Sequence, residues 1–459
     1  MSFDASKINP DCPGCQELQR ALREALERIE QQQKQLEELE RRVEELEREA
    51  HRQAAPFRRP EEQRSRNPRS PGRPKGHPGS YRKPPPQVDA MVAVPLERCP
   101  HCQGPVQRVH SREQVIEELE LRVHRVRLIT QVGRCATCGT VHSTHPLQVS
   151  TATGAAGTHL GPQAVGFAAL LNKQLGLPLA KTCAVLRQCG LSLTPGGLTQ
   201  LLHRLADRLQ PLYEQLQDAL RHSPAVHADE TGWWVAGHSA SAWVYATPDT
   251  TFYTIDNRSQ QVVRRVLGDD YPGVLISDCL ASYDPHPGRK SKCFSHHLRA
   301  VSKAQAQAPA VPFLNEIQRC LRAVLALHHA RSTMAPAAYA RCVQHLQAWL
   351  DRLLDAPHEH AAAIRIANRL RKHRPHLLTC LYVEGVEPTN NLAERQLRPL
   401  VIVRKLSCGN KTNAGKRTLE ILASLAATCR QRRQDFAQLV AHTLPLQATG
   451  LPSLSALPP

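Results

Sequence analysis

The chain has 459 residues, more than one domain usually contains, which predicts several folding units. Its 59 Lys and Arg against 41 Asp and Glu give a formal net charge of +18, which favours a polyanionic partner and above all nucleic acid. No apolar run reaches the roughly 18 residues of a membrane-spanning helix and the N-terminus lacks the apolar core of a signal peptide, so we expect a cytoplasmic protein without membrane contacts.

Residues 12–50 predict a coiled coil. Between Leu18 and Leu46, apolar residues recur with alternating spacings of three and four, the period of a helix that pairs with a second helix. β-Branched residues at a positions with leucines at d favour a parallel homodimer, while a helix packed within its own chain is the alternative. Cys12 and Cys15 precede this helix, where they either form a turn or share a metal ion or a disulfide across the dimer.

A basic, proline-rich linker is predicted over residues 51–90. Residues 51–87 contain nine prolines, ten Lys or Arg and two acids, a composition that cannot form a hydrophobic core. Such a segment is extended and semi-rigid. Its basic residues, among them Arg73 and Lys75, could lie along a DNA groove, or the segment could serve as a linker alone.

Residues 91–148 predict a small zinc-binding β module. Two Cys-x-x-Cys pairs flank a stretch of alternating apolar and polar residues around Val115–Val132, which predicts a long hairpin. Four thiolates brought together at the base of that hairpin would have the tetrahedral arrangement of a structural Zn²⁺ site. Unrelated free thiols are the alternative. The four predicted ligands are Cys99, Cys102, Cys135 and Cys138.

Residues 158–222 predict a helical region. Thr194, which is followed by a proline, predicts the N-cap of the region's last helix. A helix, a short turn and a second helix carrying basic residues are typical of a helix-turn-helix that reads DNA, although a purely structural helical segment would have the same pattern. The basic residues of the second helix are His203, Arg204 and Arg208.

Residues 223–292 predict the first part of a ribonuclease-H-like α/β catalytic domain. Three β-rich segments beginning at Ala225 are followed by a helix at Ser259–Leu267 and by a buried strand that ends at Asp278. In this fold the first and fourth strands are neighbours, so Asp229 on the first strand and Asp278 on the fourth would share one face. Two such carboxylates suit Mg²⁺ (or Mn²⁺), which prefers oxygen ligands.

The sequence after residue 292 predicts three further segments: a helical insertion at 293–385, the last part of the catalytic domain at 386–418 and a C-terminal element at 419–459. Thr389 or Asn390 would cap a helix that carries Glu394 in its first two turns. Glu394 would supply the third metal ligand, and Arg395 or Arg398 would contact phosphate.

Two other acids compete with this assignment. Glu230 follows Asp229 on the same strand and therefore faces the opposite side, which makes it the poorer ligand. Asp284 lies beyond the strand that ends at Asp278, where it could support a ligand without touching the metal.

Three motifs surround the proposed ligands: His227-Ala-Asp229-Glu-Thr-Gly-Trp, Ser277-Asp278-Cys-Leu-Ala-Ser-Tyr283-Asp and Thr389-Asn-Asn-Leu-Ala-Glu394-Arg-Gln-Leu-Arg398. Together they resemble the IS66 family of bacterial insertion-sequence transposases. That family also has a coiled coil, a basic linker, a four-cysteine zinc module and a short C-terminal element, so the resemblance spans nearly the whole chain. It implies a DDE triad of Asp229, Asp278 and Glu394 in a bacterial cytoplasmic enzyme.

The resemblance also implies partners, namely double-stranded DNA at the element ends and at the target, and accessory proteins encoded by the same element. The insertion contains a segment similar to a Cys-x-x-His segment of the family, in which His296 and His297 either bind metal or pack. Basic residues beyond Glu394 would hold phosphates, a solvated loop being the alternative. The predicted DNA contacts are Arg73, Lys75, Arg395, Arg398, Arg404, Lys405, Lys411, Lys416 and Arg417.

The predicted reaction is DNA cleavage and strand transfer. Two divalent ions would activate water to cut the element end, and the freed 3′-hydroxyl would then attack a target strand at the same site. One alternative is a metal-dependent nuclease of the same fold that cuts without joining, although a coiled coil able to pair two DNA ends argues against it. The other is an inactive DNA-binding derivative, which would need no triad.

Overall fold

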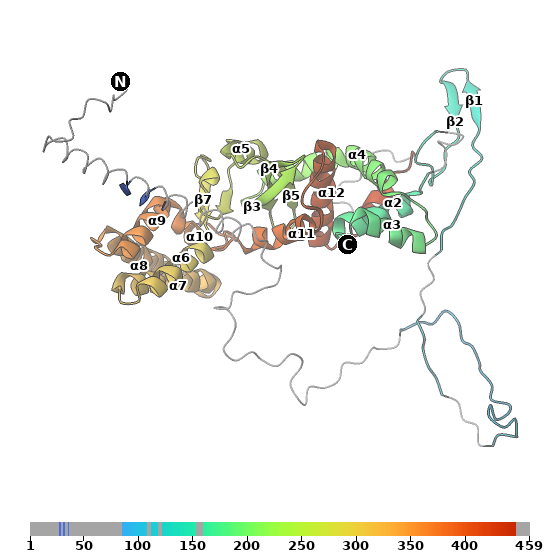
Figure 1. The fold of residues 1–459 in the computed structure, drawn as a ribbon, viewed down its shortest axis with the longest axis horizontal. Coiled ribbons are helices and arrows are strands. Elements are labelled where there is room, and N and C mark those ends of the chain that lie inside the picture. The colour runs from blue at the N-terminus through green and yellow to red at the C-terminus, as the bar shows by residue number, and fades with distance from the viewer. Residues whose placement is uncertain are drawn as a thin grey trace, which may run out of the picture. The chain divides into compact units, whose positions relative to one another are not determined.

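The structure, a computed structural model, describes residues 27–28, 31–32, 35, 85–107, 112–117, 122–152 and 159–446 (Figure 1). The chain divides into two compact units, 1–116 and 117–459. Nearly all of the predicted coiled coil and most of the predicted linker lie outside the described residues, as do Cys12, Cys15, Arg73 and Lys75.

Each Cys-x-x-Cys pair of the predicted zinc module lies in a tight turn. The Cys99 N–H donates to the Gly104 carbonyl at 3.0 Å and closes the first turn. The second pair lies at the tip of an antiparallel hairpin formed by β1 (Val132–Cys135) and β2 (Gly139–His142). Within each pair the two thiols are close enough to interact, Cys102 with Cys99 and Cys138 with Cys135.

The predicted strands around Val115–Val132 are wrong. Residues 112–117 and 122–131 form no strand among those described, and the ladder begins only at Val132. The partner strand β2 is four residues long and pairs only with β1, so the hairpin cannot extend further back. The second cysteine pair therefore lies at the tip of a short hairpin and not at the base of a long one.

Helices occupy most of the chain from 162 to 221: α2 (Pro162–Ala169), the π-helix η4 (Leu170–Gln174), α3 (Leu179–Gln188) and α4 (Pro195–Arg221). The predicted cap of α4 is confirmed, because the Thr194 hydroxyl accepts a hydrogen bond from the Gly197 N–H at 3.1 Å. Leucines at helical spacing are buried along the whole of α4, so one of its faces packs on the rest of the unit.

A five-stranded mixed sheet follows: β3 (Ala225–Val235), β4 (His238–Ala246), β5 (Thr251–Asp256), β6 (Val274–Ser277) and β7 (Arg289–Lys292). Its order is β5-β4-β3-β6-β7, with β5, β4 and β3 antiparallel and β3, β6 and β7 parallel. The helix α5 (Gln260–Leu267) connects β5 to β6. The predicted pairing of the first and fourth strands is confirmed, while β7 was not predicted.

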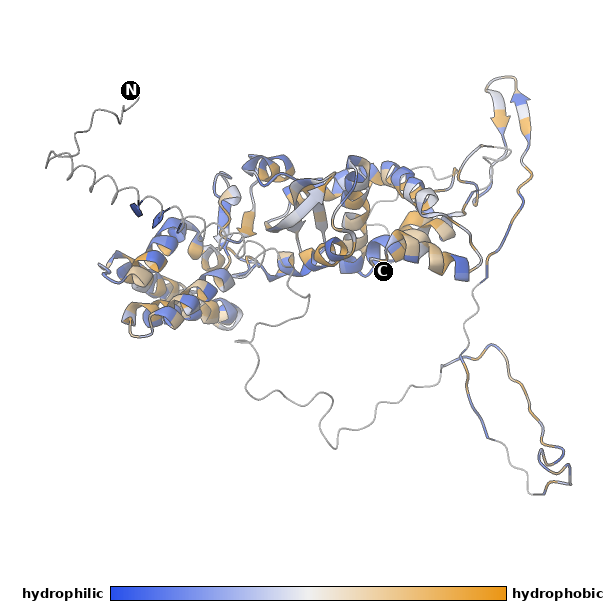
Figure 2. Ribbon diagram, viewed as in Figure 1, coloured by the Kyte–Doolittle hydropathy of each residue, from blue (hydrophilic) through white to orange (hydrophobic). Residues whose placement is uncertain are grey.

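Three further helices follow the insertion: α11 (Asn391–Ser407), α12 (Asn413–Arg432) and α13 (Phe436–Thr443). One face of the sheet, with Val226 and Tyr245, shares a core with α4, α5, α12 and α13. The opposite face, with Trp233 and Val244, packs against α11 and the other side of α12. In Figure 2 blue and orange residues alternate around many of these helices, as expected for amphipathic helices that bury one side.

The insertion consists of α6 (Phe294–Gln307), α7 (Pro312–Ala330), α8 (Pro336–Asp355), α9 (Ala361–Leu377) and α10 (Thr379–Tyr382). These helices form a core of their own around Leu321 and Leu350, which Ile276 of β6 joins. The insertion therefore continues the hydrophobic core of the sheet and returns the chain to it at α11.

The element boundary predicted at 418/419 is wrong, because α12 continues through it. Residues Thr418–Cys429 are buried on all sides of this helix and contribute to both cores beside the sheet. A helix that is buried on all sides lies inside a domain and does not begin a separate one. None of the described helices combines the length and the apolar character that a membrane crossing needs.

Candidate active site

Asp229 and Asp278 come from neighbouring parallel strands. The last paired residues of β3 and β6 are His227 and Ile276, and each acid lies two positions beyond its paired residue. Parallel strands keep the same register and period, so this spacing favours a common level and a common face for the two acids, although β6 itself ends at Ser277. The charge of Asp278 also raises the pKa of Asp229, as two neighbouring carboxylates would, and the metal site that they would form stays a prediction.

Asp229 lies among other carboxylates. Burial, followed by the charges of Glu230, Asp278 and Glu394, raises its pKa to about 7, although a hydrogen bond from the Glu230 N–H at 2.9 Å lowers it. The third acid of the predicted triad is thus close enough to act on the first. A buried carboxylate whose pKa is raised by neighbouring negative charges favours binding of a cation.

Asp278 is fixed by the loop that follows β6. Its Oδ1 accepts the Leu280 N–H at 2.9 Å, and its backbone carbonyl accepts a hydrogen bond from the Lys292 ammonium at 3.0 Å. The Lys292 side chain is fully buried and also pairs with Asp284 at 3.2 Å. These contacts hold the Asp278 backbone and leave its second carboxylate oxygen for a ligand.

Asp284 is engaged by two lysines. Besides Lys292, Lys372 of α9 pairs with it at 2.8 Å. Burial alone would raise the pKa of Asp284, but the hydrogen bond from Lys372 and the charge of Lys292 lower it overall. Asp284 therefore supports the Asp278 loop through Lys292, which sequence reasoning missed, since a polar run of alternating Lys and Ser gives no signal for a buried strand.

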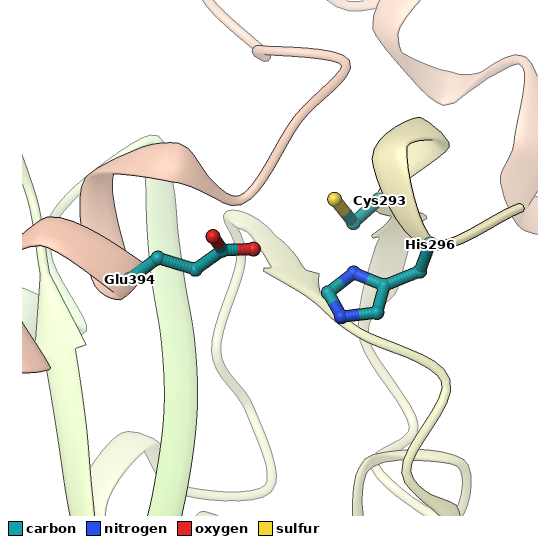
Figure 3. A group of neighbouring side chains, drawn as sticks. All are labelled: Cys293, His296 and Glu394. Carbon is teal, nitrogen blue, oxygen red and sulfur yellow. The ribbon is translucent and has the colours of Figure 1, made fainter. Parts of the chain in front are cut away.

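Glu394 lies in the first turn of α11, and Figure 3 shows its carboxylate directed toward Cys293 and His296. Its Oε1 is buried and accepts no hydrogen bond, and the nearest cation, Arg299 of α6, is 3.8 Å away. A buried carboxylate oxygen without a donor is costly unless a cation or another donor reaches it.

Asn390 positions Glu394 in a way the sequence did not indicate. It occupies the N-cap position of α11, but its side chain makes no capping bond. Instead its Nδ2 donates to the Ala228 carbonyl at 2.7 Å, and its Oδ1 accepts from His227 Nδ1 at 3.2 Å. The predicted side-chain cap is therefore wrong, because Asn390 ties the start of α11 to β3 beside Asp229.

Glu230 is held by protein donors. Its side chain is 4% exposed and accepts hydrogen bonds from Arg258 at 2.6 Å and from the Tyr283 hydroxyl at 3.0 Å. Burial raises its pKa, while the Arg258 hydrogen bond lowers it. Both carboxylate oxygens thus have partners within the chain, in keeping with the expectation that Glu230 is the poorer ligand.

The predicted DNA contacts differ in how the chain uses them. Arg395, Arg398 and Lys411 are exposed. Arg404 donates to the Thr231 hydroxyl at 2.8 Å and to the Gly232 carbonyl. A second arginine is paired internally, Arg417 with Asp207 at 2.8 Å. The two remaining described candidates are half-buried, Lys405 on α11 and Lys416 on α12.

The basic residues of α4 are also largely committed to the chain. His203 Nδ1 lies 2.6 Å from the Thr418 hydroxyl, and Arg208 donates to the Thr443 carbonyl at 3.0 Å. Arg204 is exposed. His203 and Arg208 thus bond to α12 and to the last residue of α13, whereas Arg204 is exposed, and both interpretations of the helix-turn-helix pattern stay open.

The predicted zinc ligands have thiols prepared for deprotonation. The backbone N–H groups of Cys102 and His101 lower the pKa of Cys99. Those of Cys138 and Thr137 lower the pKa of Cys135 in the same way. Backbone donors aimed at sulfur stabilise a thiolate, the form that binds metal. The Zn²⁺ site that would combine the two pairs stays a prediction.

A family model described as "Transposase IS66 family" matches residues 157–418, a range that includes all three acids. Two curated proteins of Sinorhizobium fredii are similar to this chain. Uncharacterized protein y4qI is 25% identical over 318 residues, which are 61% of this chain and 58% of y4qI, so the chain spans less than two thirds of that relative. Uncharacterized protein y4jD is 22% identical over 416 residues, 81% of this chain and 79% of y4jD.

Proposed function

Since the chain belongs to the IS66 family of transposases, we propose that it cleaves DNA at the ends of an insertion sequence and joins those ends to a target by a DDE mechanism. Asp229, Asp278 and Glu394 are the proposed catalytic residues. The proposal is supported by the family match over residues 157–418, which contains all three acids, and by the charges of Asp278 and Glu394, which add to burial in raising the pKa of Asp229.

The three acids fit divalent ions. Their donors are all carboxylate oxygens, which suit Mg²⁺ or Mn²⁺. When bound, such ions would activate the attacking oxygen and stabilise the leaving 3′-oxygen. The chain itself would fix the ligands: Lys292 holds the Asp278 backbone and Asn390 holds the start of α11.

Binding of double-stranded DNA follows from charge and exposure. Arg395 and Arg398 are exposed on α11 within one turn of Glu394, where they would contact the phosphates on either side of the scissile bond. The strand order, with Asp229 on β3 and Asp278 directly after the neighbouring β6, supports a ribonuclease-H-like fold for this domain. We further propose a homodimer formed by the N-terminal helix, a structural Zn²⁺ at the four cysteines and accessory proteins of the same element.

The proposal is tested by replacing one acid. Asp278→Ala should lower Mg²⁺-dependent cleavage of labelled element-end DNA by on the order of a thousandfold or more, since it removes a ligand needed throughout the reaction. DNA affinity should change little. The matched control is Asp269→Ala, which removes an exposed aspartate whose ion pair is with the exposed Arg264 of α5.

Cleavage by Asp278→Ala at a rate close to that of the unmodified protein would refute the site. A second assay separates the transposase from a nuclease of the same fold, in which pre-cleaved ends with 3′-hydroxyls are offered together with a target plasmid. Joined products are expected, and their absence alongside efficient cleavage would leave only the nuclease.

A further inference from the structure

A second group of metal-binding side chains adjoins the carboxylates. Cys293 directly precedes α6, His296 lies in the first turn of α6 and Glu394 lies in the first turn of α11. One potential ligand atom from each residue lies within 4.8 Å of the others. Figure 3 shows the sulfur, the imidazole ring and the carboxylate directed toward a common point.

The atoms that face this point have few other partners. His296 Nδ1 and Glu394 Oε1 are both buried without a hydrogen-bond partner. The Cys293 side chain is fully buried, and its sulfur accepts one hydrogen bond, from the Asn390 N–H at 3.2 Å. Two orphaned polar atoms beside a buried thiol are an arrangement that a bound cation would satisfy.

Arg299 now supplies the positive charge nearest to this point. Its guanidinium donates to His296 Nε2 at 3.0 Å and lies 3.8 Å from Glu394 Oε1. The Arg299 side chain is 65% exposed, so it can turn into solvent at little cost. It therefore occupies the mouth of the group without closing it.

We propose that Cys293, His296 and Glu394 bind a thiophilic divalent cation such as Zn²⁺. Sulfur, imidazole nitrogen and carboxylate oxygen together suit Zn²⁺ and exclude Mg²⁺, which binds oxygen ligands. On binding, the Cys293 thiol loses its proton to solvent, and His296 binds through Nδ1 while its proton resides on Nε2. Arg299 then leaves Nε2, and the ion links the first turns of α6 and α11.

This inference rests on the geometry of the group, and it deepens the proposed function because Glu394 belongs to both sites. It places one Zn²⁺ ion beside the carboxylates that would bind Mg²⁺ or Mn²⁺. The ion would fix the distance between the insertion and the helix that carries the third acid. Binding requires neither DNA nor catalysis, so it can be measured separately from cleavage.

The test counts zinc in the purified full-length protein. After dialysis against a weak chelator, the unmodified chain should retain one Zn²⁺ per protomer more than Cys293→Ser or His296→Ala, whatever number the other cysteines bind. Added Co²⁺ should likewise show a thiolate-to-metal absorption band that is weaker in Cys293→Ser. The matched control is Cys279→Ser, because Cys279 lies 3.6 Å from His297 in a neighbouring thiol–imidazole pair outside the group.

Equal zinc counts in the unmodified protein and in folded His296→Ala would overturn the inference. Replacement of the buried Cys293 could prevent folding, which circular dichroism would reveal. His296 is only half-buried, so His296→Ala should still fold and allows the zinc count to be measured in that case. Asp278→Ala should keep the extra zinc even though it loses cleavage. If the unmodified protein cleaves DNA but holds no zinc at this group, only this inference is contradicted. If it holds the zinc but does not cleave DNA, only the proposed function is contradicted.

Discussion

At the scale of single residues, the acids around the sheet differ in what surrounds them. The Glu230 and Asp284 carboxylates are held by cationic side chains of the chain itself. Glu394 Oε1, in contrast, has no hydrogen-bond donor, and Asp229 accepts a hydrogen bond from a backbone N–H. The sequence predicts which acids lie near a strand end, because alternation and length reveal the strands. It does not reveal Lys292, since nothing in a polar tetrapeptide indicates that its ammonium is buried.

The two lysines on Asp284 give a matched pair of substitutions. Lys292→Met should lower the free energy of unfolding by about 3 kcal/mol, because it removes the fully buried partner of the Asp284 ion pair and leaves the Asp278 carbonyl without its ammonium donor. Lys372→Met removes a partner that is 58% exposed and should cost less than about 1 kcal/mol. Denaturant unfolding of both variants measures the difference, and equal losses would contradict the role assigned to Lys292.

At the scale of elements, the start of α11 depends on β3. Asn390→Ala should lower the free energy of unfolding by about 2–4 kcal/mol, because it leaves the Ala228 carbonyl and His227 without partners. Asn391→Ala, one residue further along at an exposed position, should stay within about 0.5 kcal/mol of the unmodified chain. Urea unfolding of both variants measures the two changes in the free energy of unfolding. A neutral Asn390→Ala would mean that Asn390 does not position this helix.

The packing of α9 on α6 predicts a pH dependence. The His373 and His297 rings lie 5.8 Å apart, and burial, followed by the charge of Lys292, lowers the pKa of His373 to about 4 from an ordinary 6.5. Between these values the unfolded chain binds more protons than the folded chain, so stability is lost as the pH falls from 6.5 toward 4.

His373→Leu should remove this contribution, which amounts to about 3 kcal/mol at most, and so flatten the decline in stability. Unfolding measured in urea at several pH values between 7 and 4 tests it. An equally steep decline in His373→Leu would show that other groups cause the acid sensitivity.

At the scale of the whole molecule, the sequence predicts the elements that depend on neighbouring residues better than it predicts contacts between distant segments. The periodicity of the chain predicts β3 to β6, α5 and the cap of α4, each of which depends on neighbouring residues. The approach of Glu394 to Cys293, 101 positions earlier in the chain (394 − 293), could not be derived in this way. It results from the insertion folding around its own core and returning the chain to the sheet.

The central claim is that acids from β3, the end of β6 and α11 form one metal site that cuts DNA. Its most direct test is the rate of Mg²⁺-dependent cleavage of element-end DNA by Glu394→Gln, with the exposed Glu387→Gln as control. We predict a loss on the order of a thousandfold or more for Glu394→Gln and none for Glu387→Gln. Cleavage by Glu394→Gln at the rate of the unmodified protein would contradict the claim.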